Sequence, residues 1–217
     1  MIVDLNLQGR KVVVIGGGNE SLKRIKSLLK QNCEITIISE SISPQINRLV
    51  RSKKIKLVKQ NIKNISFISK YNPSLIITTT DDKMLNQKII KGAKKRRIIV
   101  YSSDNPEESD FSNPAIIDFE NTIQIAIFTG GKSPAMSKRL KEEAEKIFKK
   151  IITKKDISQI KLQKIVREKA KKKISTQIER KEYLKRIMEY KEIDQLIKAG
   201  QMKKAEKRAD TILRDWK

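Results

Sequence analysis

The sequence predicts an α/β fold, with a parallel sheet in the first half of the chain and helices toward its end. Short runs rich in Ile, Val and Thr alternate with amphipathic stretches as far as Tyr101. Each run contains consecutive apolar residues, as in the strands of a parallel sheet that is buried on both faces. This alternation is typical of a doubly wound α/β unit. The predicted strands span residues 11–15, 34–39, 56–58, 75–79 and 98–101.

Two amphipathic helices are predicted among these strands. Between the first two strands, Leu22, Ile25 and Leu28 recur at helical spacing, while lysines take the opposite face. A second helix is expected at about residues 84–95, with Asp81 or Asp82 as its N-cap.

The pattern changes after Tyr101, where residues 102–114 are rich in turn-forming residues. Two further strands are predicted at 115–119 and 123–128. Ser133-Pro134 then indicates the start of a helix, with Ser as N-cap and Pro at the first helical position. The apolar stripe of this helix consists of Met136, Leu140, Ala144, Ile147 and Ile151.

From about Asp156 onward the sequence indicates several helices and gives no strand signal. We therefore expect three parts, each with its own pattern of elements. They are a dinucleotide-binding sheet domain at 1–113, a central β-then-helix segment at 114–152, and a small helical C-terminal domain at 153–217.

Cysteine and histidine usage restricts the chemistry. The 217 residues include one cysteine, Cys33, and no histidine. An internal disulfide is excluded, as expected in the reducing cytoplasm, and so are Cys/His zinc sites and imidazole bases. We expect no metal ligands, and proton transfer must fall to a carboxylate, Lys or Tyr. The apolar runs are too short to span a bilayer and no signal peptide is recognisable, so we expect a cytoplasmic protein.

The formal net charge of +24 suits either nucleic acid or a small polyanionic substrate. The basic residues are spread along the whole chain and aromatic residues make up only 5%, so no stacking platform lies among them. A basic nucleic-acid-binding protein with a nucleotide-sensing domain is the alternative hypothesis, based on the Lys-rich run at 169–173. Most such runs are solvated helix faces, and we expect no nucleic-acid partner.

Three consecutive glycines follow the first predicted strand and directly precede the first helix. They fit the G-x-G-x-x-G pattern of Rossmann-type domains, except that Ser21 replaces the third glycine. Such glycines let the backbone turn sharply and approach a pyrophosphate at the helix N-terminus. A tight turn without ligand is the alternative, but the strand–turn–helix context favours a cofactor. The predicted cofactor-binding residues here are Gly16, Gly17, Gly18, Asn19 and Glu20.

Glu40 lies at the end of the second predicted strand, about twenty residues past the glycines. An acidic residue there bonds the adenosine ribose hydroxyls and repels a 2′-phosphate. No Arg follows immediately, and Arg48 is the nearest. We therefore expect NAD as the cofactor, with Glu40 and Ser41 beside it; a solvated loop carboxylate is the alternative for Glu40.

Two segments carry a specific resemblance to a known family. The first runs from Val14 to Arg24 and contains the glycine turn. The second contains Ser102-Ser103-Asp104, then Phe-Ser-Asn-Pro-Ala-Ile-Ile-Asp at 111–118 and Thr-Gly-Gly-Lys-Ser-Pro-Ala at 129–135. Between them lie Thr79-Thr80-Asp81-Asp82 and Asn86. This order, over about residues 1–150, resembles the precorrin-2 dehydrogenase domain of siroheme synthases.

The resemblance implies a Rossmann-type NAD domain, a central dimerisation segment and a helical C-terminal part in a homodimer. It implies NAD-dependent oxidation of precorrin-2 to sirohydrochlorin, with Thr80 near the cofactor. Some members also insert ferrous iron as a second substrate to make siroheme. In them an aspartate that matches Asp104 serves both reactions, whereas taken alone Asp104 is typical of an ordinary turn residue.

The glycine-containing loop before the second-half helix is the other candidate site. Glycines ahead of a helix N-terminus expose backbone N–H groups, and a lysine adds a full positive charge, which suits a tetrapyrrole carboxylate. A well-capped helix start is the equal alternative. The predicted substrate-binding residues are Thr129, Gly130, Gly131, Lys132 and Ser133. Ser102 and Phe128 depart from the Asn and Ser common in the family, which puts ferrochelatase activity in doubt.

Overall fold

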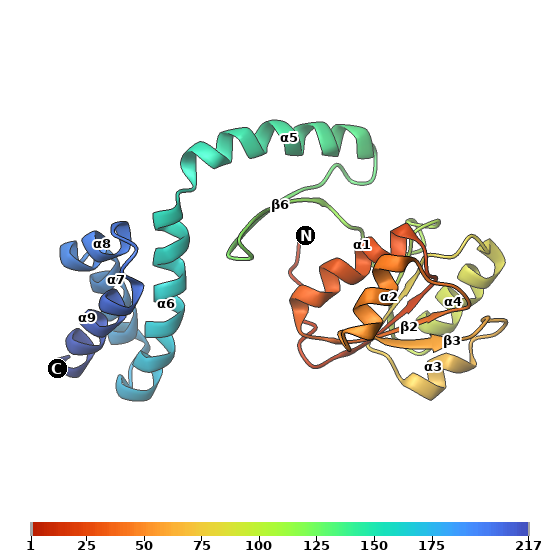
Figure 1. Cartoon of the computed structure of the whole chain (residues 1–217), viewed down its shortest axis with the longest axis horizontal. Helices are drawn as coiled ribbons and strands as arrows, with labels where there is room; N and C mark the ends of the chain where they lie inside the picture. The colour runs from red at the N-terminus through yellow and green to blue at the C-terminus, as the bar shows by residue number, and fades with distance from the viewer. Residues whose placement is uncertain (1, 217) are drawn as a thin grey trace. The chain divides into compact units, whose positions relative to one another are not determined.

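The computed structural model describes residues 2–216 of the chain. It divides into two compact units, Met1–Asn113 and Pro114–Lys217, and each is described by itself below (Figure 1). Unit 1 contains a parallel sheet flanked by helices, and unit 2 is mostly helical. The predicted α/β fold with a helical C-terminal part is therefore confirmed.

Unit 1 is built on a five-stranded sheet with the strand order β3-β2-β1-β4-β5. All four strand pairings are parallel, so the strands end at the same edge. The order reverses between β1 and β4, where open α/β sheets bind their ligands. The strands are β1 (Lys11–Ile15), β2 (Glu34–Ser39), β3 (Lys56–Lys59), β4 (Leu75–Thr78) and β5 (Ile99–Ser102). The helices are α1 (Asn19–Leu28), α2 (Pro44–Arg51), α3 (Ser66–Tyr71) and α4 (Lys83–Lys95).

The sheet separates two apolar cores, because successive strand side chains point to opposite faces. Val12 lies in one core with Ile25 of α1, and Val13 lies in the other with Ile89 of α4. All four side chains are almost fully buried. The continuous apolar runs of the sequence thus correspond to strands covered on both sides, as predicted.

The sequence located the strands of unit 1 well but missed two of its helices. β1 and β2 have the predicted bounds, and the ends of β3, β4 and β5 differ by one residue. Helices α2 and α3 were not predicted; they have 8 and 6 residues, too short for a periodic pattern to develop. Asp82 caps α4, since its Oδ1 accepts a hydrogen bond from Leu85 N at 2.9 Å.

A buried amide holds the turn between β4 and α4. The Asn86 side chain is 1% exposed and accepts hydrogen bonds from the hydroxyls of Thr78 and Thr80, the latter at 2.7 Å. Its Nδ2 donates to Thr80 O at 2.8 Å. One side chain thereby satisfies several polar groups of the turn.

We expect Asn86→Ala to lower the free energy of unfolding by about 2–3 kcal/mol, because it leaves a buried threonine hydroxyl and a carbonyl without partners. Urea unfolding followed by circular dichroism measures this loss. Gln87→Ala is the matched control, since Gln87 is exposed on the same helix and should change stability by less than about 0.5 kcal/mol. Equal effects of the two substitutions would contradict the role of the amide.

Unit 2 begins with an antiparallel hairpin of β6 (Ala115–Phe119) and β7 (Ile123–Ile127), followed by α5 (Pro134–Ile151). Both predicted strands are present, although β7 ends one residue earlier than expected. Ser133 caps α5 as predicted, because its Oγ accepts a hydrogen bond from Met136 N at 3.2 Å. None of the residues of α5 is buried.

Four further helices pack around their own apolar core. Tyr183 is fully buried there, and its hydroxyl donates to Ala209 O at 3.1 Å. Burial raises the pKa of Tyr183 to about 12. Within the Lys-rich run, Lys169 is paired with Glu206 at 2.7 Å and with Asp210 at 2.8 Å. The helices are α6 (Lys154–Lys173), α7 (Gln177–Glu189), α8 (Lys191–Lys198) and α9 (Met202–Arg214).

Candidate functional site

The glycine turn connects β1 to α1 at the carboxyl edge of the sheet. Gly16 has a φ of +110°, a backbone conformation that disfavours any residue with a Cβ. A Cβ at this position would also lie 2.6 Å from Thr79 Oγ1. A Cβ at Gly17 would overlap the Ser41 carbonyl oxygen and lie 2.8 Å from Ser39 Oγ. Contacts within the protein therefore require glycine at both positions, whether or not a ligand is bound.

Gly18 differs from its two neighbours, because a Cβ built there would meet no protein atom within 4 Å. Its φ of −87° is accessible to any residue, and it precedes the first turn of α1 without a side-chain cap. The space beside it lies at the positive end of the helix dipole, where backbone N–H groups have no intrahelical partners. This open position fits a pyrophosphate.

Ser21 occupies the third glycine position of the pattern and is fully buried. Its Oγ lies 2.6 Å from Thr79 Oγ1, and Thr79 Oγ1 also donates to Ile15 O at 2.9 Å. In the G-x-G-x-x-G pattern, the third glycine lets the helix pack closely on the sheet. Here the Ser21 hydroxyl instead links α1 to the residue after β4 by a hydrogen bond.

Glu20 carries the carboxylate of the first turn of α1. It pairs with Arg24, and with Lys23 at 3.1 Å. Partial burial raises the pKa of Glu20, but the hydrogen bonds and charges of Lys23 and Arg24 outweigh this effect and lower it overall. The negative charge is therefore neutralised within the helix, which leaves the backbone N–H of Glu20 as its means of contacting a phosphate.

The predicted cofactor residues after β2 and β4 lie at the same edge of the sheet. Glu40 is exposed, and its Oε2 accepts a hydrogen bond from Asn61 Nδ2 at 3.0 Å. Ser41 contributes its backbone to the glycine turn, since its carbonyl is the group that would collide with a Cβ at Gly17. The hydroxyl of Thr80 is engaged with Asn86.

Asp104 follows β5, the strand at one side of the sheet. It accepts a hydrogen bond from the Oγ of Ser102, which is fully buried. Ser109 Oγ in turn accepts from Ser102 N at 2.9 Å. The carboxylate itself is exposed to solvent. Ser102 thus orients Asp104 without shielding it from water.

The predicted substrate loop lies in unit 2, ahead of α5. Its Thr129 Oγ1 lies 2.9 Å from Ser137 Oγ, and Lys132 N donates to Thr129 O at 3.2 Å. The Lys132 side chain is exposed and has no ion-pair partner among residues 2–216. Ser133 N also donates to Thr129 Oγ1, at 3.4 Å, so the group that the loop presents to an incoming anion is the unpaired ammonium of Lys132.

The structure gathers one group of predicted residues and leaves the other separate. At the carboxyl edge of the sheet in unit 1 lie the glycine turn, Glu40, Ser41, Thr80 and Asp104. Residues 129–133 belong to unit 2. Sequence reasoning assigned no role to Asn61, the partner of Glu40. Only the side-by-side placement of β2 and β3 reveals this contact, because nothing in the local sequence signals it.

The sequence profile of a family described as "Putative NAD(P)-binding" matches residues 3–115, more than half of the 217 residues. Together with the parallel sheet and its glycine turn, this match shows that the chain belongs to this family of nicotinamide-nucleotide-binding domains. Within the described residues, no helix has the length and hydropathy needed to cross a membrane.

The more specific resemblance predicted from the sequence is also confirmed. The chain is 28% identical to the precorrin-2 dehydrogenase of Bacillus subtilis over 144 residues, which cover 66% of this chain and 86% of that protein. It is 34% identical over 142 residues to the siroheme synthase of Psychrobacter arcticus, covering 65% of this chain and 25% of that protein. For the siroheme synthase of Mannheimia succiniciproducens the identity is 29% over 143 residues, with coverages of 66% and 29%.

The chain therefore spans less than a third of the length of these siroheme synthases. Among solved structures, SirC, a precorrin-2 dehydrogenase, has the same fold, with a TM-score of 0.69 and 20% identity. The similarity covers 97% of this chain and 99% of that one. It extends to the helical part, which the sequence resemblance did not cover.

We expect Gly18→Ala to weaken NAD binding at least about tenfold while changing the free energy of unfolding by less than about 1 kcal/mol, because the added methyl enters only the space proposed for the phosphate. Isothermal titration with NAD and urea unfolding measure the two quantities. Gly17→Ala is the contrasting variant, and steric overlap with Ser41 should destabilise the fold itself. Unchanged NAD affinity in Gly18→Ala would contradict the placement of the phosphate.

Proposed function

We propose that this protein oxidises precorrin-2 to sirohydrochlorin with NAD as hydride acceptor. The observation that carries the proposal is the common edge of the sheet, where the open turn at Gly18 and the carboxylate of Asp104 both lie. The similarity to the Bacillus subtilis precorrin-2 dehydrogenase, which covers 86% of that protein, supports the choice of substrate.

The glycine turn supplies the binding energy for the cofactor in this proposal. Backbone N–H groups of Asn19 and Glu20 at the start of α1 face the pyrophosphate, and Glu40 accepts hydrogen bonds from the adenosine ribose hydroxyls. Asn61 holds the Glu40 carboxylate at the end of β2 through the 3.0 Å hydrogen bond. The carboxylate would repel a 2′-phosphate, and this repulsion is the basis for NAD rather than NADP.

Asp104 is the proposed base. NAD, when bound, accepts a hydride from the macrocycle, and the accompanying proton needs a separate acceptor. Asp104 follows β5, two strands from β1, a separation of about 10 Å at the usual strand spacing. This distance leaves room for a nicotinamide and the edge of a macrocycle between the turn and the carboxylate. Bound substrate would then supply the desolvation that the free protein lacks.

The loop at residues 129–133 is the proposed contact for the substrate's peripheral carboxylates. Lys132 provides a full positive charge beside the positive end of the α5 helix dipole. The high positive charge of the chain would draw such a polyanion from solution. We place the reaction in the cytoplasm, where a free cysteine stays reduced. Cys33 is half-buried, and burial raises the pKa of its thiol, so we expect this thiol to be unreactive.

Anaerobic addition of NAD to precorrin-2 and the purified protein should produce the absorption spectrum of sirohydrochlorin, and NADP should be the poorer acceptor. Asp104→Ala should lower turnover about 100-fold or more, within the usual contribution of a positioned base, while NAD affinity stays within about twofold. Stopped-flow absorbance and NAD titration measure these effects.

Glu107→Ala is the control for Asp104→Ala, since it removes an exposed carboxylate from the same loop. No spectral change with the unmodified protein would refute the proposed activity. Full turnover in Asp104→Ala would refute only the role of the aspartate. Iron insertion into sirohydrochlorin is measured in a separate assay, because siroheme synthases among the relatives raise it as a second reaction.

We also propose a homodimer whose interface includes α5. The predicted apolar stripe of this helix is present but uncovered, with Leu140 40%, Ile147 59% and Ile151 62% exposed. Directly after β7, Phe128 is 48% exposed. A soluble subunit rarely leaves such a row of large apolar side chains in water, and a second copy would cover it. The division of unit 2 into a dimerisation segment at 114–152 and a helical domain at 153–217 is part of this proposal.

Ile147→Glu combined with Ile151→Glu should convert a dimer of about 50 kDa, twice the 25.0 kDa chain, into a monomer. Because both side chains are exposed in the subunit, its helical content should be unchanged. Light scattering after size-exclusion chromatography gives the mass at micromolar concentration. Lys146→Glu, on the polar face of the same helix, should leave the mass as it is, and a monomeric unmodified protein would contradict the proposal.

A further inference from the structure

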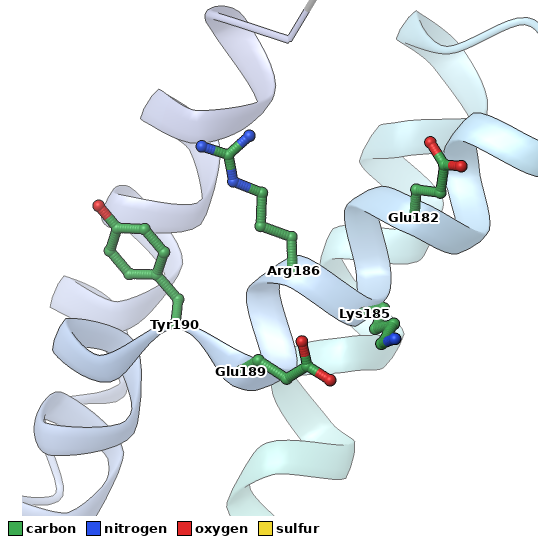
Figure 2. A pocket seen from close by; sticks show the side chains of 5 residues that line it. All are labelled: Glu182, Lys185, Arg186, Glu189 and Tyr190. Atoms are coloured by element: carbon green, nitrogen blue, oxygen red, sulfur yellow. The ribbon is translucent and has the colours of Figure 1, made fainter.

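The helical bundle of unit 2 contains a pocket that the proposed oxidation does not use. It has a volume of about 400 Å³ and lies between the end of α7 and the second half of α9. Arg186 and Tyr190 form one wall, and Arg208, Ile212 and Trp216 contribute to the other. A second hollow of about 330 Å³ adjoins it and shares Arg186 and Tyr190 (Figure 2).

Cationic and aromatic side chains alternate along this pocket. The Arg208 guanidinium lies 5.3 Å from the centre of the Tyr190 ring, and the Arg186 guanidinium lies 5.8 Å from the Trp216 ring. The Trp216 ring also packs edge-on against the buried Tyr183, at 5.3 Å between ring centres. The flat faces are therefore held in place by the core of the bundle.

The two arginines differ in their electrostatic partners. Arg208 Nε lies 2.7 Å from Glu192 Oε2, and Arg208 Nη2 donates to Tyr190 Oη at 2.7 Å. Arg186 contacts the Trp216 ring but forms no ion pair or hydrogen bond with the described residues. In Figure 2 its guanidinium extends toward the side of Tyr190, whereas Glu189 points away from it. Arg186 thus has no direct carboxylate partner, although Glu182 and Glu189 also line the adjoining hollow.

Thr211 in the lining is engaged, since its Oγ1 donates to Lys207 O at 3.2 Å. Asp215, a carboxylate of the lining, lies 3.5 Å from Arg214 Nε. The Nε1 of Trp216 is buried without a hydrogen-bond acceptor in residues 2–216. The C-terminal ends of α7 and α9 carry only about half a negative charge each, less than the full charge of a guanidinium. The pocket therefore favours an anion located at Arg186.

We propose that this pocket binds an organic carboxylate with a flat apolar body. The carboxylate pairs with Arg186, whose planar guanidinium matches it in a two-point contact, and the flat body lies against the Tyr190 and Trp216 rings. A volume of about 400 Å³ suits a small aromatic acid or one carboxylate-bearing edge of a larger ring system. This site requires neither NAD nor Asp104, so it stands independently of the proposed oxidation.

Trp216 is the sole tryptophan of the chain, which makes it a direct reporter of binding. Benzoate titrated into the full-length ¹⁵N-labelled protein should shift the single indole N–H resonance in a saturable manner. Benzamide, which has the same shape without the charge, should bind at least about tenfold more weakly. Sirohydrochlorin, titrated separately, distinguishes a carboxylate on a macrocycle from a free aromatic acid.

Arg186→Gln should weaken benzoate binding at least about tenfold, and Arg186→Lys should have a smaller effect because it keeps the charge. Lys203→Gln removes one charge from an exposed position on α9 and should leave the affinity unchanged. Far-UV circular dichroism of each variant shows that the bundle is folded. Three results would overturn the proposal. They are an indole resonance that responds to neither benzoate nor sirohydrochlorin, equal responses to benzoate and inorganic phosphate, and full binding of benzoate by Arg186→Gln.

Discussion

The close approach of the backbone at Gly17 to the loop after β2 is the constraint on which the geometry of unit 1 depends. Ser43 N donates to Gly17 O at 2.9 Å, and the Ser41 carbonyl fills the space where a side chain would stand. This contact fixes the direction in which the chain leaves β1 and so aims the first turn of α1 at the switch point of the sheet. The neutral contact between Ser21 and Thr79 then holds the helix against the end of β4.

The positions of the strands in unit 1 and their parallel arrangement could be predicted because burial on both faces leaves a pattern that depends only on nearby residues. The capping residues Asp82 and Ser133 were also recognisable, since a cap acts within its own turn. Helix α2 also has a capping signal, Ser43-Pro44, and Ile46 N lies 3.4 Å from Ser43 Oγ. The helix is too short to show a periodic apolar pattern after this signal, so the sequence did not predict it. The local sequence therefore shows where a helix begins. It does not show whether a short helix forms, because a short helix has no periodic pattern.

The candidate site was predictable only where its residues adjoin strand ends. Parallel strands bring Glu40 and Asp104 to one edge, which the sequence order already indicates. The partners of these residues were not predictable, because Asn61 meets Glu40 across 21 positions and Arg186 meets Trp216 only when α7 packs on α9. Such pairings arise from tertiary packing, and no residue near either partner signals them.

The amide at Asn86 joins β4 to α4 through hydroxyl, amide and carbonyl groups alone. None of these groups gains or loses a proton between mildly acidic and mildly alkaline conditions. The turn between β4 and α4, beside the switch point, should therefore keep one shape throughout that range. A bell-shaped rate profile recorded there would therefore contain no contribution from a rearrangement of this turn.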